Sequence, residues 1–204
     1  TRFWLVGLGY LAATLALTAP FSFHLTSRML SLDSDATLVQ WIVSWDIYAF
    51  THQPLHIFDA NTFAPLANTL AFAENLIGGA LFAAPVYWLT HNLALAINLV
   101  ALLSIPISGL GTYLLARRLR ISDAGAILAG LIFAFTPPRF LRIEQFQLTT
   151  IQWMPFCLAY VHAYLDEGRR RDLRWALGFF SLQALSGGHG ATFLTAALVE
   201  IRMD

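Results

Sequence analysis

Long apolar runs separated by short polar segments dominate the sequence. A helix needs about 20 residues to span a bilayer, and apolar runs of about that length or shorter occupy residues 3–21, 75–90, 93–115, 124–138, 149–165, 173–185 and 191–201. Each run predicts a helix, and no Gly/Ser or Pro linker divides the chain. We therefore expect an all-α fold that forms a single transmembrane domain over residues 1–204.

The arginines predict which segments share a side of the membrane. All basic residues are arginine, and they cluster at 117–120 and again at 169–174, with Arg2 at the start of the first run. The positive-inside rule places these arginines in the cytoplasm. An even number of crossings must then separate Arg2 from the first cluster, but three apolar runs lie between them. We assign residues 75–90, a short run that contains Pro85, to a helix in the outer interface, which leaves about six transmembrane helices.

This topology creates one long outer loop, residues 22–92, which is too long for a passive connector. Residues 36–50 of the loop have an amphipathic pattern, because five large apolar residues fall on one helical face: Leu38, Trp41, Ile42, Trp45 and Tyr48. Aromatic residues on such a stripe suit the level of the lipid headgroups. We therefore expect two juxtamembrane helices in this loop, over residues 36–50 and 75–90.

Composition supports a membrane protein and excludes several other classes. Hydrophobic residues make up 57% of the chain and charged residues 12%, whereas soluble domains contain about 25% charged residues. The 12 basic and 12 acidic residues balance, so nucleic acid is not an expected partner. The chain begins at Thr1 and ends at Asp204, just after an apolar run, and we expect it to be part of a longer protein whose first run is a retained span.

Acids of the outer loop are the first candidates for chemistry. Asp33 and Asp35 precede the amphipathic helix, where acids ordinarily cap the helix N-terminus. The alternative is a carboxylate at the membrane boundary that acts as a general base or holds a divalent cation. Glu74 precedes the second surface helix and has the same two interpretations. Together with Asp35 it would supply the oxygen ligands that Mg²⁺ or Mn²⁺ prefers.

The second outer loop contributes basic candidates. Arg139, Arg142 and Glu144 lie on the side where arginine is rare, and they predict either an interfacial salt bridge, a contact with anionic membrane lipids, or a bidentate phosphate site. His189, flanked by glycines at an outer turn, is either structural or a ligand. Glycines 109, 111, 125 and 130 predict close packing between spans. Because the sequence lacks a Walker loop and a nucleophile elbow, nucleotide hydrolysis is not expected.

Several segments together resemble the N-terminal half of the GT-C superfamily of membrane glycosyltransferases. They are residues 33–45 (DSDATLVQWIVSW), 58–65 (FDANTFAP), 73–78 (AENLIG) and 137–155, which begins PPRF and ends QWMP. The resemblance is nearest to a bacterial branch of multispan proteins and more distant to protein mannosyltransferases and the lipid A aminoarabinose transferase. It covers nearly the whole chain, and its motifs are moderately specific as a set and weak singly.

The resemblance implies a protein of the bacterial inner membrane that transfers a sugar from a polyprenyl-phosphate carrier to an acceptor on the outer face. Asp35, with Asp33 as the alternative, maps to the proposed base or metal-binding acid, and Glu74 maps to the acid of the second surface helix. The aminoarabinose transferase pattern places Lys directly after that acid. Asn75 stands here, so the resemblance implies that Arg139 or Arg142 contacts the phosphate. Two other classes remain open: a lipid or solute transporter or flippase, and a non-catalytic membrane assembly protein. Transporters place ionisable residues near the middle of their spans, and few lie there in this sequence.

Overall fold

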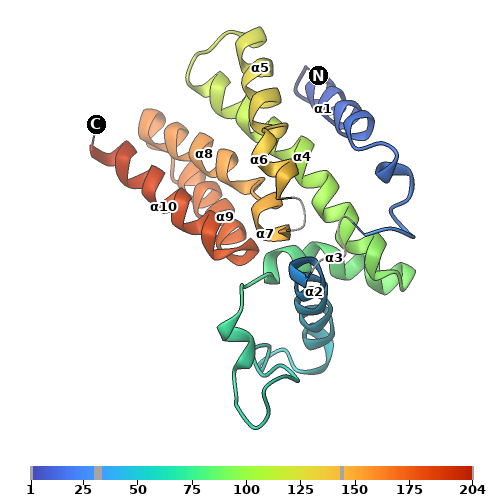
Figure 1. Ribbon diagram of the computed structural model, residues 1–204. Coiled ribbons are helices and arrows are strands. Elements are labelled where there is room, and N and C mark those ends of the chain that lie inside the picture. Colours follow the sequence, from blue (N-terminus) through green and yellow to red (C-terminus); the bar gives the residue numbers. More distant parts are fainter. Residues whose placement is uncertain (1, 30–33, 143–144, 204) are drawn as a thin grey trace.

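All regular elements in the described part of the chain are helices, as the sequence predicts (Figure 1). The computed structural model describes residues 2–29, 34–142 and 145–203. The helices are α1 (Arg2–Leu17), η1 (Phe21–Phe23), α2 (Ser34–His52), η2 (Thr69–Phe72), α3 (Ile77–Thr90), α4 (Leu93–Arg118), α5 (Asp123–Ala134), α6 (Pro137–Leu141), α7 (Phe146–Thr149), α8 (Trp153–Glu167), α9 (Arg170–Ser186) and α10 (Gly188–Met203).

Ion pairs gather the predicted cytoplasmic arginines at one end of the molecule, here called the basic end. Asp123 lies 3.7 Å from the guanidinium of Arg2 and 3.8 Å from that of Arg117. Arg118 lies 3.3 Å from Glu167, which lies two residues before the second arginine cluster. Exposed ion pairs of this kind add little stability, but they show that the start of α1 and both arginine clusters lie side by side.

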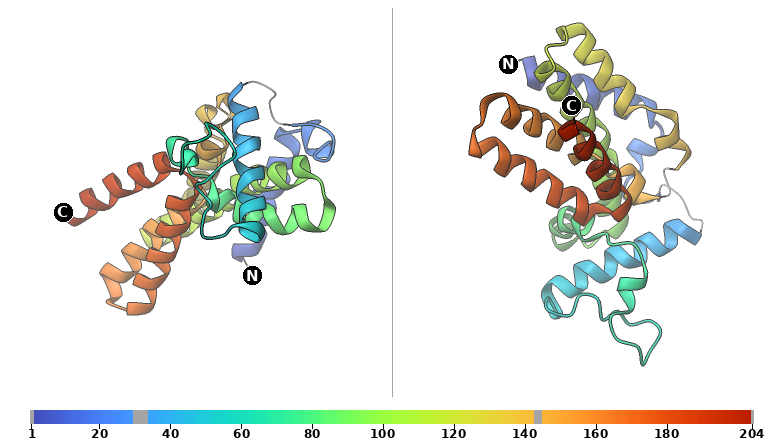
Figure 2. Two further views of the ribbon diagram at one scale, coloured as in Figure 1. Left: turned by 90° about the horizontal axis from the view of Figure 1, so that it is seen from below. Right: turned by 90° about the vertical axis from the view of Figure 1, so that its left-hand side faces the viewer.

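The opposite end, here called the loop end, is formed by α2, α3, residues 145–152 around α7, and the turn between α9 and α10. Helices α4, α5, α8 and α9 run alternately between the two ends, whereas α2 and α3 stay at the loop end (Figures 1 and 2). Helix α3 begins beside the end of α9, since a Cβ on Gly78 would lie 2.7 Å from the Ser186 amide nitrogen. It ends next to Asn92, whose side chain donates to the Thr26 carbonyl at 3.0 Å. The run 75–90 therefore does not pass from one end to the other.

Close packing of α1, α4 and α5 depends on small residues around Tyr10. The Tyr10 hydroxyl donates to the Ile127 carbonyl at 2.9 Å, and its ring lies against Gly109 and Gly130, where any Cβ would clash with it. Gly111 admits the Phe156 ring in the same way, because a Cβ there would lie 2.8 Å from it. The close contacts at Gly109, Gly111 and Gly130 confirm that these glycines allow the helices to pack closely. A Cβ on Gly125 would instead meet only residues of its own turn.

Helices α8 and α9 form a tight antiparallel pair. Their connection passes through Gly168, which has φ +66°, a left-handed conformation that favours glycine and ends α8. Aromatic rings stack along the contact, with Phe179 of α9 lying 5.2 to 6.0 Å from a row of rings, those of Trp153, Phe156, Tyr160 and Trp175. Such ring pairs add to the stability gained from burial. The pair forms one side of the bundle, next to α4.

Helix α2 packs through a different face from the one that the aromatic stripe indicates. Val39, Ile42, Val43 and Ile47 are buried against α3 and the outer loop. Leu38 and Tyr48 lie outside that contact and are about half exposed. Ile42 therefore belongs to the packed face, Trp41 and Trp45 lie partly buried at its border, and the stripe is exposed only at Leu38 and Tyr48.

Two stretches of the described chain are long and apolar enough to cross a membrane, judged by length and composition: Leu93–Arg118 and Asp123–Leu141. Helices α1 and α3 are apolar but shorter, with 16 and 14 residues. The structure is therefore an all-helical bundle with two candidate membrane spans.

Candidate functional site

Two acids of the outer loop meet the segment around α7 at the loop end. The exposed carboxylate of Asp35, in the first turn of α2, accepts a hydrogen bond from the Gln145 side chain at 3.2 Å. Glu74 accepts from the Gly188 amide at 2.7 Å. A Cβ on Gly187 would lie 2.9 Å from Cβ of Gln147 and 3.4 Å from Oε1 of Glu74, so Glu74 also adjoins this segment. The fold thus brings two acids from one loop next to the 145–147 segment, Asp35 at Gln145 and Glu74 near Gln147.

Glu74 occupies the N-terminus of α10. The first amides of a helix lack intrahelical partners and carry a partial positive charge, and Oε1 of Glu74 accepts one of them, that of Gly188. The His189 ring nitrogen Nδ1 lies 3.4 Å from the same carboxylate. Helix α3 begins only at Ile77, so Glu74 caps a helix distant in sequence rather than the one that follows it. This contact agrees with a structural role for the acid.

Arg139 is buried beneath this surface and is held by neutral groups. Its side chain donates to the Ser108 hydroxyl at 2.7 Å and to the carbonyls of Ala134 and Thr149 at 3.1 and 3.0 Å. Only Nε lacks a partner among the described residues. With 3% of the residue exposed, the guanidinium joins α4, α5 and α7. Its terminal nitrogens are already engaged by the protein, so its role as a phosphate contact stays a prediction.

Arg142 is the more accessible of the two outer arginines. Its side chain is exposed and forms no hydrogen bond or ion pair with the described residues. It lines a cavity of about 300 Å³ together with His189 and one edge of Arg139. The remaining walls are mostly apolar and come from α5, α6, α7, α8, α10 and the link between α7 and α8: Phe133, Pro138, Leu148, Ile151, Met154 and Phe193. A cation at the edge of an apolar cavity suits an anionic group attached to a hydrophobic chain.

Two candidates cannot be placed, and no metal site is evident in the described chain. Asp33 and Glu144 lie outside the described residues. Within residues 2–29, 34–142 and 145–203, no three His, Cys, Asp or Glu side chains form a group that could hold a metal ion. Asp35 and Glu74 bond to different partners, and one oxygen of Glu74 is already occupied. Since Asp33 and Glu144 are outside these residues, the Mg²⁺ or Mn²⁺ site predicted at Asp35 and Glu74 stays a prediction.

Sequence reasoning missed a buried acid in α2. Asp46 is fully buried among the apolar residues between α2 and α3, and neither of its oxygens has a partner among the described residues. Burial raises the pKa of its carboxyl from 3.8 to about 7. A signal was present, since Asp46 follows Ile42 by four residues and precedes Ala49 by three, which places it on their helical face.

Comparison with known proteins does not identify a family. No family model, no curated protein and no solved structure matches this chain.

Proposed function

We propose that this protein is a membrane-embedded glycosyltransferase of the GT-C type, which transfers a sugar from a polyprenyl-phosphate carrier to an acceptor at the loop end. The observation that carries the proposal is the meeting of Asp35 and Glu74 with the 145–147 segment, at the end opposite the basic end. A sugar nucleotide is confined to the cytoplasm, so a reaction on the outer face needs a lipid-linked donor.

The exposed surface of the bundle supports membrane insertion. Large apolar side chains of α1 project outward, with Trp4, Leu5 and Leu8 between 61% and 71% exposed, and Ile132 of α5 is 65% exposed. Large apolar side chains exposed on neighbouring turns of one helix suit a contact with lipid. We place the protein in the bacterial inner membrane as a multi-pass protein, with the basic end in the cytoplasm and the loop end outside.

The proposed chemistry assigns different tasks to Asp35 and Arg142. The Asp35 carboxylate takes the proton from an acceptor hydroxyl, and the hydroxyl oxygen forms a bond to the anomeric carbon. The bond from that carbon to the carrier phosphate breaks, and the phosphate leaves with the electron pair. Arg142, at the edge of the 300 Å³ cavity, pairs with that phosphate. General-base assistance of this kind contributes about 10²–10⁴-fold to a rate.

A matched pair of variants tests the role of Asp35. The full chain in membrane vesicles is supplied with radiolabelled polyprenyl-phosphate sugars, and transfer of label to envelope material is measured. Asp35→Asn should reduce transfer by at least about 100-fold while expression and insertion stay normal. Asp166→Asn makes the same change of charge at an exposed position near the basic end and should leave transfer unchanged.

Two outcomes would contradict the proposal. Full transfer by Asp35→Asn would remove this acid from the site. If the parental protein moves the labelled carrier across the bilayer but transfers no sugar, the protein is a flippase.

A further inference from the structure

The exposed face of α2 and the loop that follows it form a second depression, separate from the Asp35 carboxylate. It has a volume of about 530 Å³ and is lined by Trp41, Ser44, Trp45, Tyr48, Gln53 and Asn61. Small-ligand sites commonly have volumes of about 300–1,000 Å³. The nearest of these positions on the helix, Trp41, lies six residues beyond Asp35, which corresponds to about 9 Å along the helix axis.

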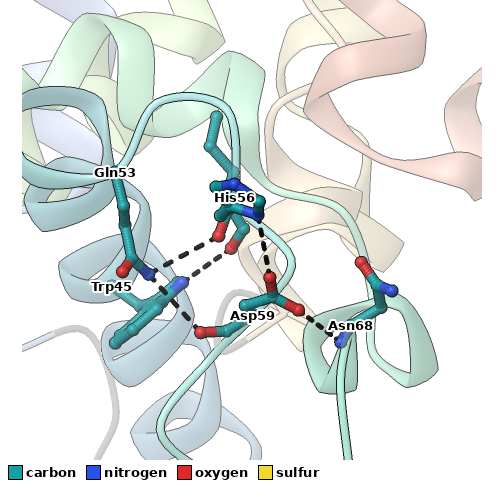
Figure 3. Close-up of polar contacts among 6 residues, drawn as sticks. Trp45, Gln53, His56, Asp59 and Asn68 are labelled. Atoms are coloured by element: carbon teal, nitrogen blue, oxygen red, sulfur yellow. Dashed lines mark hydrogen bonds and ion pairs between the residues drawn. The ribbon is translucent and has the colours of Figure 1, made fainter.

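Hydrogen bonds hold this surface in place without any ligand (Figure 3). The Trp45 indole nitrogen donates to the Ile57 carbonyl at 2.7 Å, and the Gln53 amide nitrogen lies within hydrogen-bond distance of two carbonyls of the loop, at 3.4 and 3.5 Å. Asp59 joins the two sides of the loop, because its carboxylate accepts a hydrogen bond from the backbone amide of Asn68 at 2.7 Å. The indole and the side-chain amide are therefore fixed before binding, which reduces the entropy lost when a ligand is ordered.

Several polar groups of this depression remain free to bond to a ligand. The Ser44 hydroxyl, the Tyr48 hydroxyl and the Asn61 amide form no hydrogen bond with residues of the described chain, and Ser44, Tyr48 and Asn61 are exposed. Gln53 uses its nitrogen to hold the loop, which leaves its oxygen as an acceptor. The depression thus offers donors and acceptors beside three aromatic rings.

The chemistry of the lining selects among ligands. The described lining carries no formal charge, so it has no cation to pair with a phosphate. An acyl chain would leave the amides of Gln53 and Asn61 unpaired. A sugar ring suits both the aromatic and the polar side chains of the lining. Its weakly positive C–H groups face the negative π surface of an aromatic ring, and its hydroxyls bond to amides and hydroxyls. We infer that this depression is a binding site for a neutral saccharide.

A neighbouring depression extends the surface and indicates a ligand of more than one ring. It has a volume of about 470 Å³ and lies on the other side of Ser44 and Tyr48, which line both depressions. Tyr87 and Trp88 of α3 contribute further rings to it. The Tyr48 ring is stacked on His52 at 4.2 Å, which fixes its orientation between the two depressions. The ligand is therefore an oligosaccharide that crosses α2, and this inference does not depend on catalysis by Asp35.

Binding of neutral trisaccharides to the full chain tests the inference. The protein in nanodiscs of uncharged phospholipid is titrated with maltotriose, cellotriose, mannotriose and triacetylchitotriose, and binding is followed by tryptophan fluorescence and by saturation-transfer NMR of the sugar. At least one sugar should saturate the protein below about 10 mM. Asn61→Ala and Trp41→Ala should weaken that binding about tenfold, because each removes one ligand contact.

Matched controls distinguish this depression from other surfaces of the protein. Trp4→Ala removes a tryptophan that is 71% exposed on α1 and should leave sugar binding unchanged, and Asp35→Asn should also bind as the parent does. Ser44→Phe fills the depression from an exposed helix position and should abolish binding. Absence of binding by all four sugars, or unchanged binding by Asn61→Ala and Ser44→Phe, would overturn the inference. If no sugar binds, but vesicles of anionic phospholipid bind to the protein and Trp41→Ala removes that binding, the depression is a lipid contact instead.

Discussion

Ionisation of Asp46 should weaken the packing of α2 against α3 and the outer loop. The residue is fully buried without a hydrogen-bond partner among the described residues, and burial raises the pKa of the carboxyl from 3.8 to about 7. The folded protein therefore retains this proton at pH values at which the unfolded chain has lost it. The stability is fully present below about pH 4 and is lost as the pH rises through about 7.

The size of this effect follows from the two pKa values. Each pKa unit corresponds to about 1.4 kcal/mol, so the interval from 3.8 to about 7 corresponds to a loss of about 4 kcal/mol, complete at about pH 8. Above that pH both states are ionised and the loss stays constant. A change of this size is a large fraction of the stability of a typical domain, which is about 5–15 kcal/mol.

Replacing the acid by its amide tests this reasoning. Asp46→Asn keeps the size of the side chain but cannot ionise, so its free energy of unfolding in mixed micelles should vary less between about pH 4 and pH 8 than that of the parent. The advantage of the variant should grow with pH by up to about 4 kcal/mol. Asp166→Asn serves as the control and should follow the parental curve. Parallel curves for the parent and Asp46→Asn would refute the argument.

Three further substitutions test the contacts around the candidate site by unfolding in micelles. Glu74→Gln should lower the stability by about 1 kcal/mol, since an amide interacts less favourably than a carboxylate with the N-terminus of α10; equal stability would mean that this cap is unimportant. Gly78→Ala should cost about 1–3 kcal/mol because its Cβ would meet the Ser186 backbone, whereas Gly9→Ala, with open space around its Cβ, should not destabilise α1. Arg139→Met should lower the free energy of unfolding by about 2–4 kcal/mol, because it leaves buried acceptors unpaired. If Arg142→Met destabilised the protein more than Arg139→Met, the structural role of Arg139 would be contradicted.

Local pattern was sufficient to predict the helices and the two ends of the molecule. The amphipathic run 36–50 corresponds to α2 (Ser34–His52), and the run 93–115 corresponds to α4 (Leu93–Arg118). Arginine spacing indicated that Arg2 and both clusters share a side, and the ion pairs of Asp123 and Glu167 join them. The helices depend on residues that are close in sequence, and the shared side of the arginines depends on whether an even or odd number of helices lies between them. Both can be read from the sequence alone.

The partners of the candidate acids could not be predicted in this way. Gln145 is separated from Asp35 by 110 positions and Gly188 from Glu74 by 114. Neither pair belongs to a motif with fixed spacing, so only the packing of distant helices brings its members together. The burial of Arg139 was equally hidden, because an arginine next to two prolines in an outer turn has the pattern of a surface residue.

The bond from Gly188 to Glu74 has a consequence for the order of events during synthesis. Ribosomes add about 5–20 residues per second, so the 114 positions between the two residues take roughly 6–23 s to make. During that interval the Glu74 carboxylate has no α10 to cap. The cap of α10 by Glu74 therefore forms only after residue 188 has been made, and a nascent chain arrested before that residue should leave the Glu74 carboxylate without this partner.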